Sequence, residues 1–234
     1  MKFPPLVPGI FMKRANRFIA DVRLTDGTVL RAYVPTTGRL TGALRSGCRV
    51  WLEPADGPAR KTPFTLVLTE LENGGLCSVN AGLANGLFEE AVRTGSLDAF
   101  RCDLIKREVT WGKSRLDFRL RQGENVCWVE VKSVTYAENG VGMFPDAPTA
   151  RGRKHLEELV RLAGAGDSAS VVFVAQRPDA ACFRPFDAID PAFAADLRKA
   201  QAQGVGVHAY CCEVSTDRID LTQEIPVDLT PTAS

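Results

Sequence analysis

The side chains best suited to chemistry in this sequence lie in the stretch RLDFRLRQGENVCWVEVKSVT, residues 115–135. Apolar and polar residues alternate on both sides of its short QGEN break, which predicts a β-hairpin with one buried face. Glycine at the first tip position suits the type II′ turn that two-residue hairpin loops favour, so we place Gly123 and Glu124 at the tip. With that tip, both strands agree about which face is buried.

The polar face of this hairpin brings like charges together. In the predicted register Asp117 lies opposite Glu130, and Lys132 lies two residues from Glu130 on the same face. Like charges opposed across strands are destabilising. One candidate for offsetting the repulsion is Lys132, and the other is a divalent cation, because carboxylates hold Mg²⁺ together with waters and phosphate oxygens. A lone Glu-x-Lys triplet would favour a surface salt-bridge cluster instead, but the opposed aspartate favours the cation.

The residues after Val79 predict the elements that must position this hairpin. The segment NAGLANGLFEEAVRTG reads as an amphipathic helix, with Glu90 near its apolar face and Glu89 pointing away. The apolar face holds Leu83, Leu87 and Ala91. Strands are predicted at residues 104–111, 116–120 and 126–131.

A second group of elements follows a polar loop, YAENGVGMFPDAP. The segment TARGRKHLEELVRLAG predicts a helix capped by Thr149, with Leu156, Leu159, Val160 and Ala163 on its buried stripe. SVVFVAQ is a strand covered on both faces, PAFAADLRKAQAQG is a helix that ends at Gly204, and VGVHAYCCEV is a last strand. The order of helix, three strands, helix, strand, helix and strand predicts a mixed sheet flanked by helices.

The first third of the chain has a different texture. Short β-type runs such as RFIADVRL, VLRAYV, CRVWLEP, FTLVLTEL and LCSV are separated by turn residues, which predicts a small barrel or sandwich of about five strands. Small barrels often bind nucleic acid through cations and aromatic rings. The residues available for this are Lys13, Arg14, Arg17, Arg39, Arg45, Arg60 and Lys61, with Tyr33 and Trp51.

Charge distribution agrees with a basic and an acidic part. The net charge of the chain is +1, but residues 1–78 hold eleven Lys and Arg against six Asp and Glu, whereas residues 79–234 hold eighteen against twenty-two. A basic module joined to an acidic one suits a protein that grips a polyanion with one part and concentrates carboxylates in the other. A chance asymmetry of solvated charge is the alternative.

Composition excludes several other classes of protein. Seven scattered cysteines without a CxxC pair, and only two histidines, favour reduced thiols over disulfides or a zinc site. Neither a GxSxG elbow nor a Walker phosphate loop is present. Because the chain has no apolar run of roughly 18 residues and no secretory leader pattern, we expect a soluble, cytoplasmic protein that does not bind membranes.

These motifs together resemble a known family. Asp117, followed on the next strand by Glu130 and Lys132, within this order of elements, resembles the core of the PD-(D/E)XK nuclease superfamily. Nearly the whole chain, from about residue 5 to about residue 230, is similar to SfsA, the bacterial "sugar fermentation stimulation protein" family. The stretches that carry the resemblance are KRANRFIADV, VPTTGRLTG, VNAGLANGLFEEA, RLDF, VEVKSVTYAENGVGMFPDAPTARGRKHLEEL and GVGVHAY.

The resemblance implies an α/β (α+β overall) protein with two domains. Residues 1–78 would form an OB-like β-barrel that binds nucleic acid, and residues 79–234 a restriction-endonuclease-like mixed sheet flanked by helices. The family is described as DNA-binding and linked to regulation of sugar metabolism, especially of maltose. Thr36 departs from the family pattern, because asparagine is expected at that position of a PNTG motif.

The resemblance also carries over a candidate active site. Asp117, Glu130 and Lys132 would be catalytic, with Glu90 as a further acidic group; Asp117, Glu130 and Glu90 would then bind Mg²⁺ or Mn²⁺. Glu108, on the preceding strand, competes with Glu90 for that role. The candidate DNA contacts are Arg14, Arg17, Arg39, Arg115, Arg151, Lys154 and His155.

Two functions follow from this reading. The first is a metal-dependent DNA nuclease, and the second is a non-catalytic DNA-binding regulator that keeps a nuclease-like fold. Retention of Asp117, Glu130 and Lys132 favours the nuclease, because a carboxylate pair repels phosphate when no metal is bound. The oligomeric state is left open, with a homodimer among the options.

Overall fold

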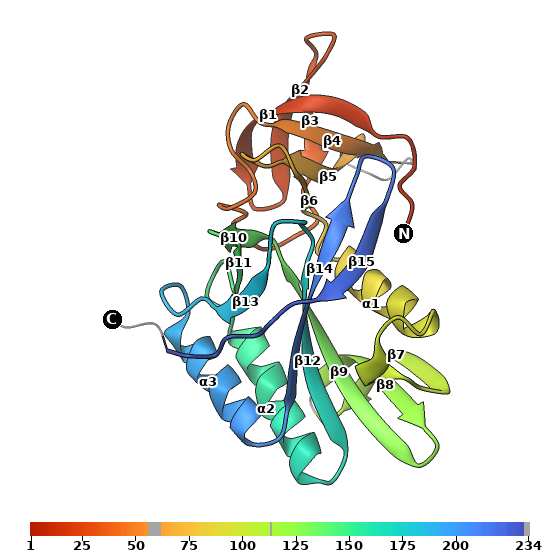
Figure 1. Cartoon of the computed structure of the whole chain (residues 1–234). Helices are drawn as coiled ribbons and strands as arrows, with labels where there is room; N and C mark the ends of the chain where they lie inside the picture. Colours follow the sequence, from red (N-terminus) through yellow and green to blue (C-terminus); the bar gives the residue numbers. More distant parts are fainter. Residues whose placement is uncertain (56–61, 113, 232–234) are drawn as a thin grey trace.

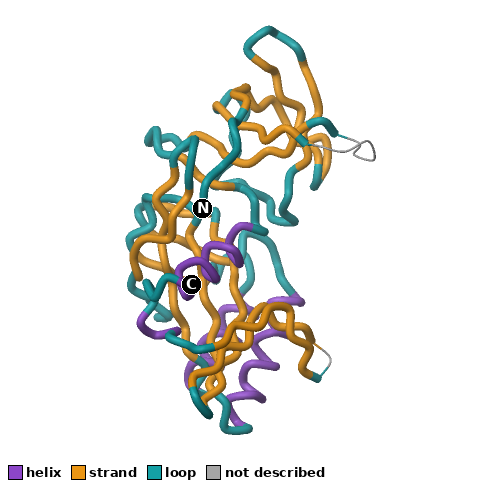
Figure 2. The backbone as a smooth tube through the Cα atoms, turned by 90° about the vertical axis from the view of Figure 1, so that its right-hand side faces the viewer, coloured by secondary structure: helices purple, strands orange, loops and turns teal. Residues whose placement is uncertain are grey.

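The computed structural model describes residues 1–55, 62–112 and 114–231 of the 234-residue chain. The N-terminal strands form one lobe, and the remaining strands and all three α-helices form a second lobe beneath it (Figure 1). Figure 2, turned by 90°, shows the same division, with strands in the first lobe and the helices in the second.

The first lobe is a closed β-barrel with OB-type connections. Its sheet has the strand order β3-β2-β1-β4-β5-β6, and a short parallel pairing of β3 with β5 closes it. The strands are β1 Val7–Asn16, β2 Ile19–Leu24, β3 Val29–Tyr33, β4 Arg49–Pro54, β5 Phe64–Glu70 and β6 Leu76–Ser78. The predicted barrel is therefore confirmed.

Two details of the barrel differ from the sequence reading. The first strand, β1, was not predicted, because its VPGIFMKRAN sequence contains proline and glycine and lacks strict alternation. Trp51, proposed as an exposed aromatic ring, is only 8% exposed and packs against Val67 and Leu68. Arg60 and Lys61 lie outside the described residues.

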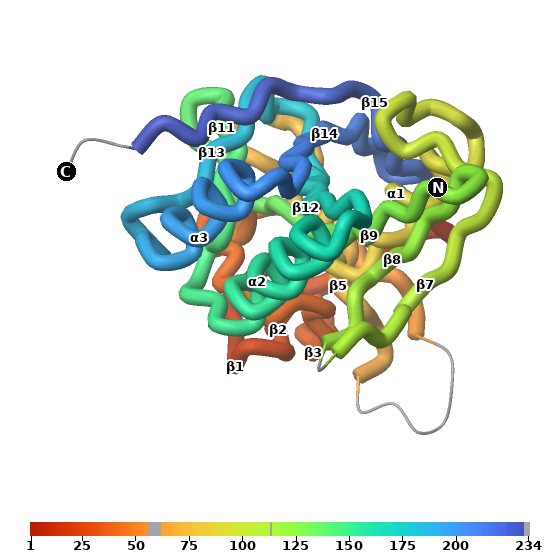
Figure 3. The backbone as a smooth tube through the Cα atoms, turned by 90° about the horizontal axis from the view of Figure 1, so that it is seen from below, coloured from red at the N-terminus to blue at the C-terminus, as the bar shows by residue number. Residues whose placement is uncertain are grey.

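The second lobe contains a six-stranded mixed sheet with the order β15-β14-β12-β9-β8-β7. In Figure 3, α1 lies on one side of this sheet and α2 and α3 lie on the other. The strands are β7 Leu104–Trp111, β8 Ser114–Gln122, β9 Asn125–Val134, β12 Ser168–Ala175, β14 Gly206–Val214 and β15 Ile219–Glu224. The helices are α1 Leu83–Arg93, η1 Asp98–Phe100, α2 Ala150–Gly164 and α3 Pro191–Ala202.

The polar stretch after β9 is not a simple loop, and that prediction was wrong. It contains a hairpin of β10 (Tyr136–Glu138) and β11 (Val141–Phe144), and β11 pairs in parallel with β13 (Cys182–Pro185). Asn139 and Gly140 at its tip have φ values of 50° and 79°. An Asn-Gly pair is the preferred sequence for a two-residue hairpin turn with positive φ, so the feature was present in the sequence.

Polar contacts join the two lobes. Arg177, which follows β12, donates through Nη1 to the carbonyl oxygens of Gly42 in the barrel and Thr135 in the sheet domain, at 3.2 and 2.8 Å. The backbone N–H of Leu40 donates to Asp146 at 2.9 Å. Because separating the lobes would break the hydrogen bond from Arg177 to Gly42 and the one from Leu40 to Asp146, the contacts favour one relative placement of barrel and sheet.

In the described part of the chain, no helix combines the length and apolarity needed to cross a membrane. All seven cysteines are described, and each is a free thiol. The prediction of reduced cysteines agrees with this arrangement.

The face of the sheet beneath α1 supplies a test of the packing. Phe88 of α1 is fully buried, with its ring 5.1 Å from that of Phe100 and 5.2 Å from that of Phe118. Phe88→Ala should lower the free energy of unfolding by about 3–5 kcal/mol in urea titration, because it leaves a cavity against β8. Phe18→Ala, at a position 43% exposed, is the matched control and should cost less than about 0.5 kcal/mol. A loss below about 1 kcal/mol for Phe88→Ala would contradict this packing.

Candidate functional site

The predicted hairpin register is present. Phe118 pairs with Val129, Leu120 with Cys127 and Gln122 with Asn125, which leaves Gly123 and Glu124 at the tip. Gly123 has a φ of 57°, the positive value that the first tip position of a type II′ turn requires. The ladder ends at the pair of Phe118 and Val129, one step short of Asp117 and Glu130. The strands therefore separate at the point where the two carboxylates begin.

Asp117 fills the opening between these strands. Its Oδ2 accepts the backbone N–H of Val131 at 2.9 Å, and its Oδ1 accepts from Asn85 Nδ2 of α1 at 2.9 Å. On its other side, the ladder of β7 with β8 skips Glu108, whose φ is 54°. A positive φ at a non-glycine residue marks a local irregularity, so the backbone departs from regular pairing on both sides of Asp117.

Glu130 is the most enclosed charged group of the site. Its side chain is 4% exposed, and its Oε1 accepts from Lys132 Nζ at 2.5 Å and from His155 Nδ1 on α2. Lys132 Nζ also lies 3.3 Å from His155 Nδ1. The second carboxylate oxygen, Oε2, is buried and finds no hydrogen-bond donor among the described residues. A buried acceptor without a donor is rare in proteins, and an ion or a water that reaches Oε2 would satisfy it.

The electrostatics of the two carboxylates differ because their neighbours differ. Burial raises the pKa of Asp117, and the nearby Glu130 carboxylate raises it further, against the hydrogen bond from Val131. Burial also acts to raise the pKa of Glu130, but Lys132 and His155 together outweigh it, so this pKa lies below its usual range. Glu130 is thus held ionised, whereas ionisation of Asp117 is opposed.

The donor set fits a hard divalent cation. Carboxylate oxygens are the ligands that Mg²⁺ prefers, and the unsatisfied Oε2 of Glu130 faces no competing donor among the described side chains. The predicted third carboxylate is not in place, since within the described ranges no group of three or more His, Cys, Asp or Glu side chains is arranged to hold a metal. The structure brings together two carboxylates, those of Asp117 and Glu130.

The predicted orientation of α1 is wrong. Glu90 is exposed, and its carboxylate pairs with the ammonium group of Met1 at 2.9 Å. Glu89 is the more enclosed residue and pairs with Arg93 and Arg107. The buried residues of α1 also include Phe88 and Val92, which turn the apolar face away from Glu90. The α1 side chain that contacts Asp117 is Asn85, which sequence reasoning missed although it lies in the quoted NAGLANG motif.

Glu108, the competing acidic residue, also has another partner. Its Oε2 lies 2.7 Å from Arg115 Nε. The side chain proposed as a further acidic group, Glu108, is therefore paired with a side chain proposed to contact DNA, Arg115. Arg151 and Lys154 are exposed on the first turns of α2, whose predicted cap is confirmed by Thr149 Oγ1 accepting from Gly152 N at 3.0 Å. His155, on the same helix, is buried against Glu130.

Arg14, Arg17 and Arg39, three of the barrel residues proposed to contact DNA, lie close together, and Arg17 lines a cavity between the barrel and the sheet domain. Arg14 Nη1 donates to the carbonyl oxygens of Gly38 and Arg39, and Nη2 donates to that of Arg17. Arg14 therefore organises the barrel loops, while the side chain of Arg39 is exposed. Thr36 accepts the backbone N–H of Gly38 at 3.2 Å, so threonine supplies a turn acceptor at the position that departs from the family pattern.

Two cavities lie next to the β8–β9 hairpin, one near its carboxylates and one near its tip. One, of about 250 Å³, lies between the lobes and is lined by Arg17, Thr36, Ser133, Asp146 and Thr149, among others. Ser133 directly follows Lys132, so this cavity adjoins the strand that carries the cluster.

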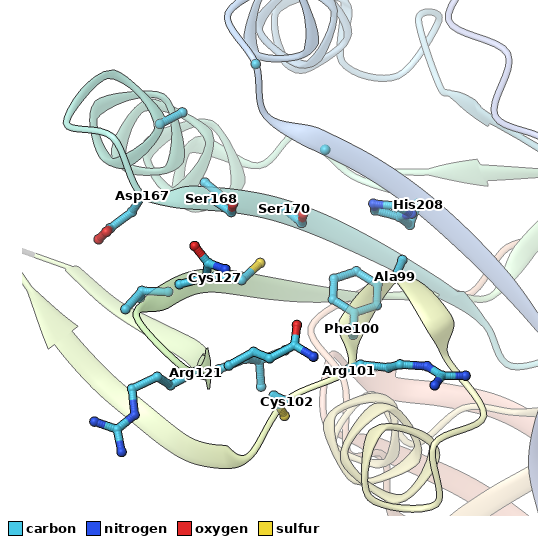
Figure 4. Close-up of a pocket in the computed structure, with 18 of the residues that line it drawn as sticks. Ala99, Phe100, Arg101, Cys102, Arg121, Cys127, Asp167, Ser168, Ser170 and His208 are labelled. Carbon is cyan, nitrogen blue, oxygen red and sulfur yellow. The ribbon is translucent and has the colours of Figure 1, made fainter.

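The second cavity, of about 740 Å³, lies near the hairpin tip, away from the carboxylates. Figure 4 shows Cys127, Ser170 and His208 on strands of the sheet, facing Phe100 and Cys102. His208 packs edge-on against Phe100, with 4.9 Å between the ring centroids.

The fold and cluster define a class: an OB barrel joined to a restriction-endonuclease-like domain. Comparison with family models agrees, since residues 12–79 match the SfsA N-terminal OB domain and residues 82–218 match the sugar fermentation stimulation protein RE domain. The chain belongs to the SfsA family.

Individual relatives cover almost the whole chain. A sugar fermentation stimulation protein homolog from Shewanella sp. (strain MR-4) is 42% identical over 228 residues, covering 96% of this chain and 97% of that protein. The homolog from Geobacter metallireducens is 41% identical and covers 98% of this chain and 100% of its own. The structure of Pyrococcus furiosus SfsA in complex with Ca²⁺ matches with a TM-score of 0.89 at 33% identity, over 97% of this chain and 98% of that chain.

The raised pKa of Asp117 leads to a prediction about how the stability of the protein depends on pH. Asp117→Asn can keep both hydrogen bonds if the Asn85 amide rotates, and it removes the buried charge. Because the folded-state pKa of Asp117 is raised, the wild type loses stability as the pH rises through that value, starting above the unfolded pKa of about 3.9. Without divalent ions, the variant should therefore be more stable near neutral pH by up to about 1 kcal/mol.

Urea titrations from acidic to neutral pH measure this difference, which should disappear as the pH falls toward about 4. Glu124→Gln, at the exposed hairpin tip, is the control and should show no such gain. A variant that is less stable than the wild type at neutral pH would contradict the electrostatic account.

Proposed function

We propose that this protein is a divalent-metal-dependent DNA phosphodiesterase of the cytoplasm. The observation that carries the proposal is the unsatisfied, buried Oε2 of Glu130, beside Asp117 at the point where β8 and β9 separate. Binding alone does not need two carboxylates there, because without a cation they repel phosphate. A site that binds both a metal and a phosphodiester accounts for them.

Each residue has a role that follows from its contacts. Asp117 and Glu130 would hold Mg²⁺ or Mn²⁺, which when bound polarises a phosphodiester and lowers the pKa of a water. Lys132, 2.5 Å from Glu130, would orient the attacking water or stabilise charge at phosphorus. His155 fixes the Glu130 carboxylate from α2, and Asn85 fixes that of Asp117 from α1.

The family comparisons support the proposal of a bound divalent cation. The RE-domain model covers residues 82–218, which include the complete cluster, and the Pyrococcus furiosus relative is described in complex with Ca²⁺. Ca²⁺ and Mg²⁺ both take oxygen ligands, so the same carboxylates suit either ion. DNA is the proposed partner because the barrel domain is of the OB type, a fold that binds oligonucleotides.

A second candidate function is a non-catalytic DNA-binding regulator of sugar metabolism, which keeps the nuclease-like fold. The observation that favours it is the engagement of Glu90 by Met1 and of Glu108 by Arg115, which leaves the cluster with two acidic groups. The printed name of the relatives, which refers to sugar fermentation, also points in this direction. The two functions differ in whether DNA is cut.

The wild-type protein should cleave single-stranded or duplex DNA in the presence of Mg²⁺ or Mn²⁺. Asp117→Ala and Lys132→Ala should lower the cleavage rate by about 100-fold or more, because each removes a group that acts on the reacting phosphate. DNA affinity should change little, since the barrel supplies most contacts. Gel-based cleavage assays and fluorescence anisotropy measure the two properties separately.

The matched control is Glu124→Ala, which removes a carboxylate from the same hairpin at its exposed tip and should leave the rate unchanged. Glu90→Gln and Glu108→Gln decide whether either is a third acidic group. Intact DNA after prolonged incubation of the wild type with a panel of substrates and metals would rule out the enzyme and leave the regulator.

A further inference from the structure

The outward face of β1, β2 and β3 is unusual for a solvent-exposed sheet. Side chains directed outward from neighbouring strands form rows: Ile19 beside Tyr33, and Arg31 and Lys13 on either side of Asp21. A third row places Arg23 beside the exposed Val29. This face, which we call the barrel face, consists of Lys13, Ile19, Asp21, Arg23, Val29, Arg31 and Tyr33.

The barrel face is cationic and carries apolar groups between the charges. Lys13, Arg23 and Arg31 are exposed, and Asp21 is the one acidic residue among the seven that define this face. Arg31 lies 3.5 Å from Asp21 yet remains 72% exposed, so its charge is available to a partner. Cations interleaved with apolar surface complement a flexible polyanion that also has flat apolar groups, which describes a nucleic-acid strand.

Two aromatic side chains are exposed near the end of the barrel face where β2 begins and β3 ends. Tyr33, at the end of β3, is 39% exposed, and Phe18, in the turn between β1 and β2, is 43% exposed. Their strands are held together there by the Val34 N–H, which donates to the Phe18 carbonyl oxygen at 2.8 Å. Nucleic-acid-binding barrels use exposed aromatic side chains as surfaces on which bases stack.

This aromatic end leads into the cavity between the lobes. Arg17 precedes Phe18 and Thr36 lies three residues after Tyr33, and both line that cavity. Its opposite wall includes Ser133, the neighbour of Lys132. A strand that crosses the barrel face and passes Tyr33 therefore arrives next to the catalytic strand β9.

We propose that the DNA bound by this protein is single-stranded, lying along the barrel face with bases stacked on Tyr33 and Phe18. Stacking requires an unpaired base, because a duplex buries the faces of its bases against each other. The cluster agrees, since the side chains of Glu130 and Lys132 are only 4% and 12% exposed and suit a thin strand better than a rigid duplex. The inference rests on the proposed function for its choice of DNA.

The test is fluorescence anisotropy in EDTA, where cleavage cannot occur. The probe is a labelled oligonucleotide of about 20 nucleotides, longer than the roughly 4–16 that one OB barrel covers, as a single strand and as a duplex. The single strand should bind more tightly. Tyr33→Ala should weaken single-strand binding by roughly 5- to 100-fold and leave duplex binding unchanged, because only unpaired bases stack.

Several variants make the result specific. Tyr33→Phe should retain single-strand affinity, and Phe18→Ala should reduce it independently. Leu104→Ala removes a side chain of similar exposure, 37%, from β7 in the other lobe and should have no effect. Thermal melting confirms that each variant is folded.

Tighter duplex binding, or a Tyr33→Ala variant with unchanged single-strand affinity, would overturn the proposal. Tighter binding of RNA of the same sequence would overturn the choice of DNA. Binding is measured without metal, so the two hypotheses can fail separately. A protein that binds single strands through Tyr33 but never cuts DNA would refute the proposed nuclease activity and leave the inferred single-strand binding intact. A protein that cuts DNA but prefers duplex would refute this inference alone.

Discussion

The structure of the sheet domain depends on two acidic side chains being held together out of water. Regular pairing of β8 and β9 stops before Asp117 and Glu130, and the Asp117 carboxylate accepts a hydrogen bond from the backbone N–H of Val131 at 2.9 Å. Lys132 and His155 stabilise the ionised form of Glu130 from its own strand and from α2. Such a cluster costs stability compared with an apolar one, and proteins retain that kind of strain mainly at functional sites.

The surrounding elements can be understood as supports for this cluster. Both α1 and α2 pack on the sheet through apolar faces, and each contributes one polar side chain, Asn85 and His155, to a carboxylate. The barrel meets the same region through Arg177 and Asp146, so the cavity between the lobes opens beside β9. In the proposed function, the sheet domain would catalyse the reaction and the barrel would bind DNA, and the two lobes share one boundary.

Sequence reasoning succeeded where a local rule fixed the answer. The Gly123 tip and two-residue periodicity gave the correct register, and Thr149 capped α2 as expected, because turn and cap chemistry act over a few residues. It failed where distant packing decides. The face of α1 toward the sheet depends on Phe88 meeting Phe100 and Phe118, so Glu90 was misplaced and Asn85 was missed. No spacing rule predicts where two strands separate.

The central claim is that Asp117 and Glu130 form a cation site. Crystals grown with saturating Mn²⁺ test it directly, because anomalous scattering locates that ion without reference to activity. We expect an anomalous peak at coordination distance from both Glu130 Oε2 and an Asp117 carboxylate oxygen, and its loss in Glu130→Gln crystals. Saturated wild-type crystals with Mn²⁺ bound elsewhere and no peak between these carboxylates would contradict it.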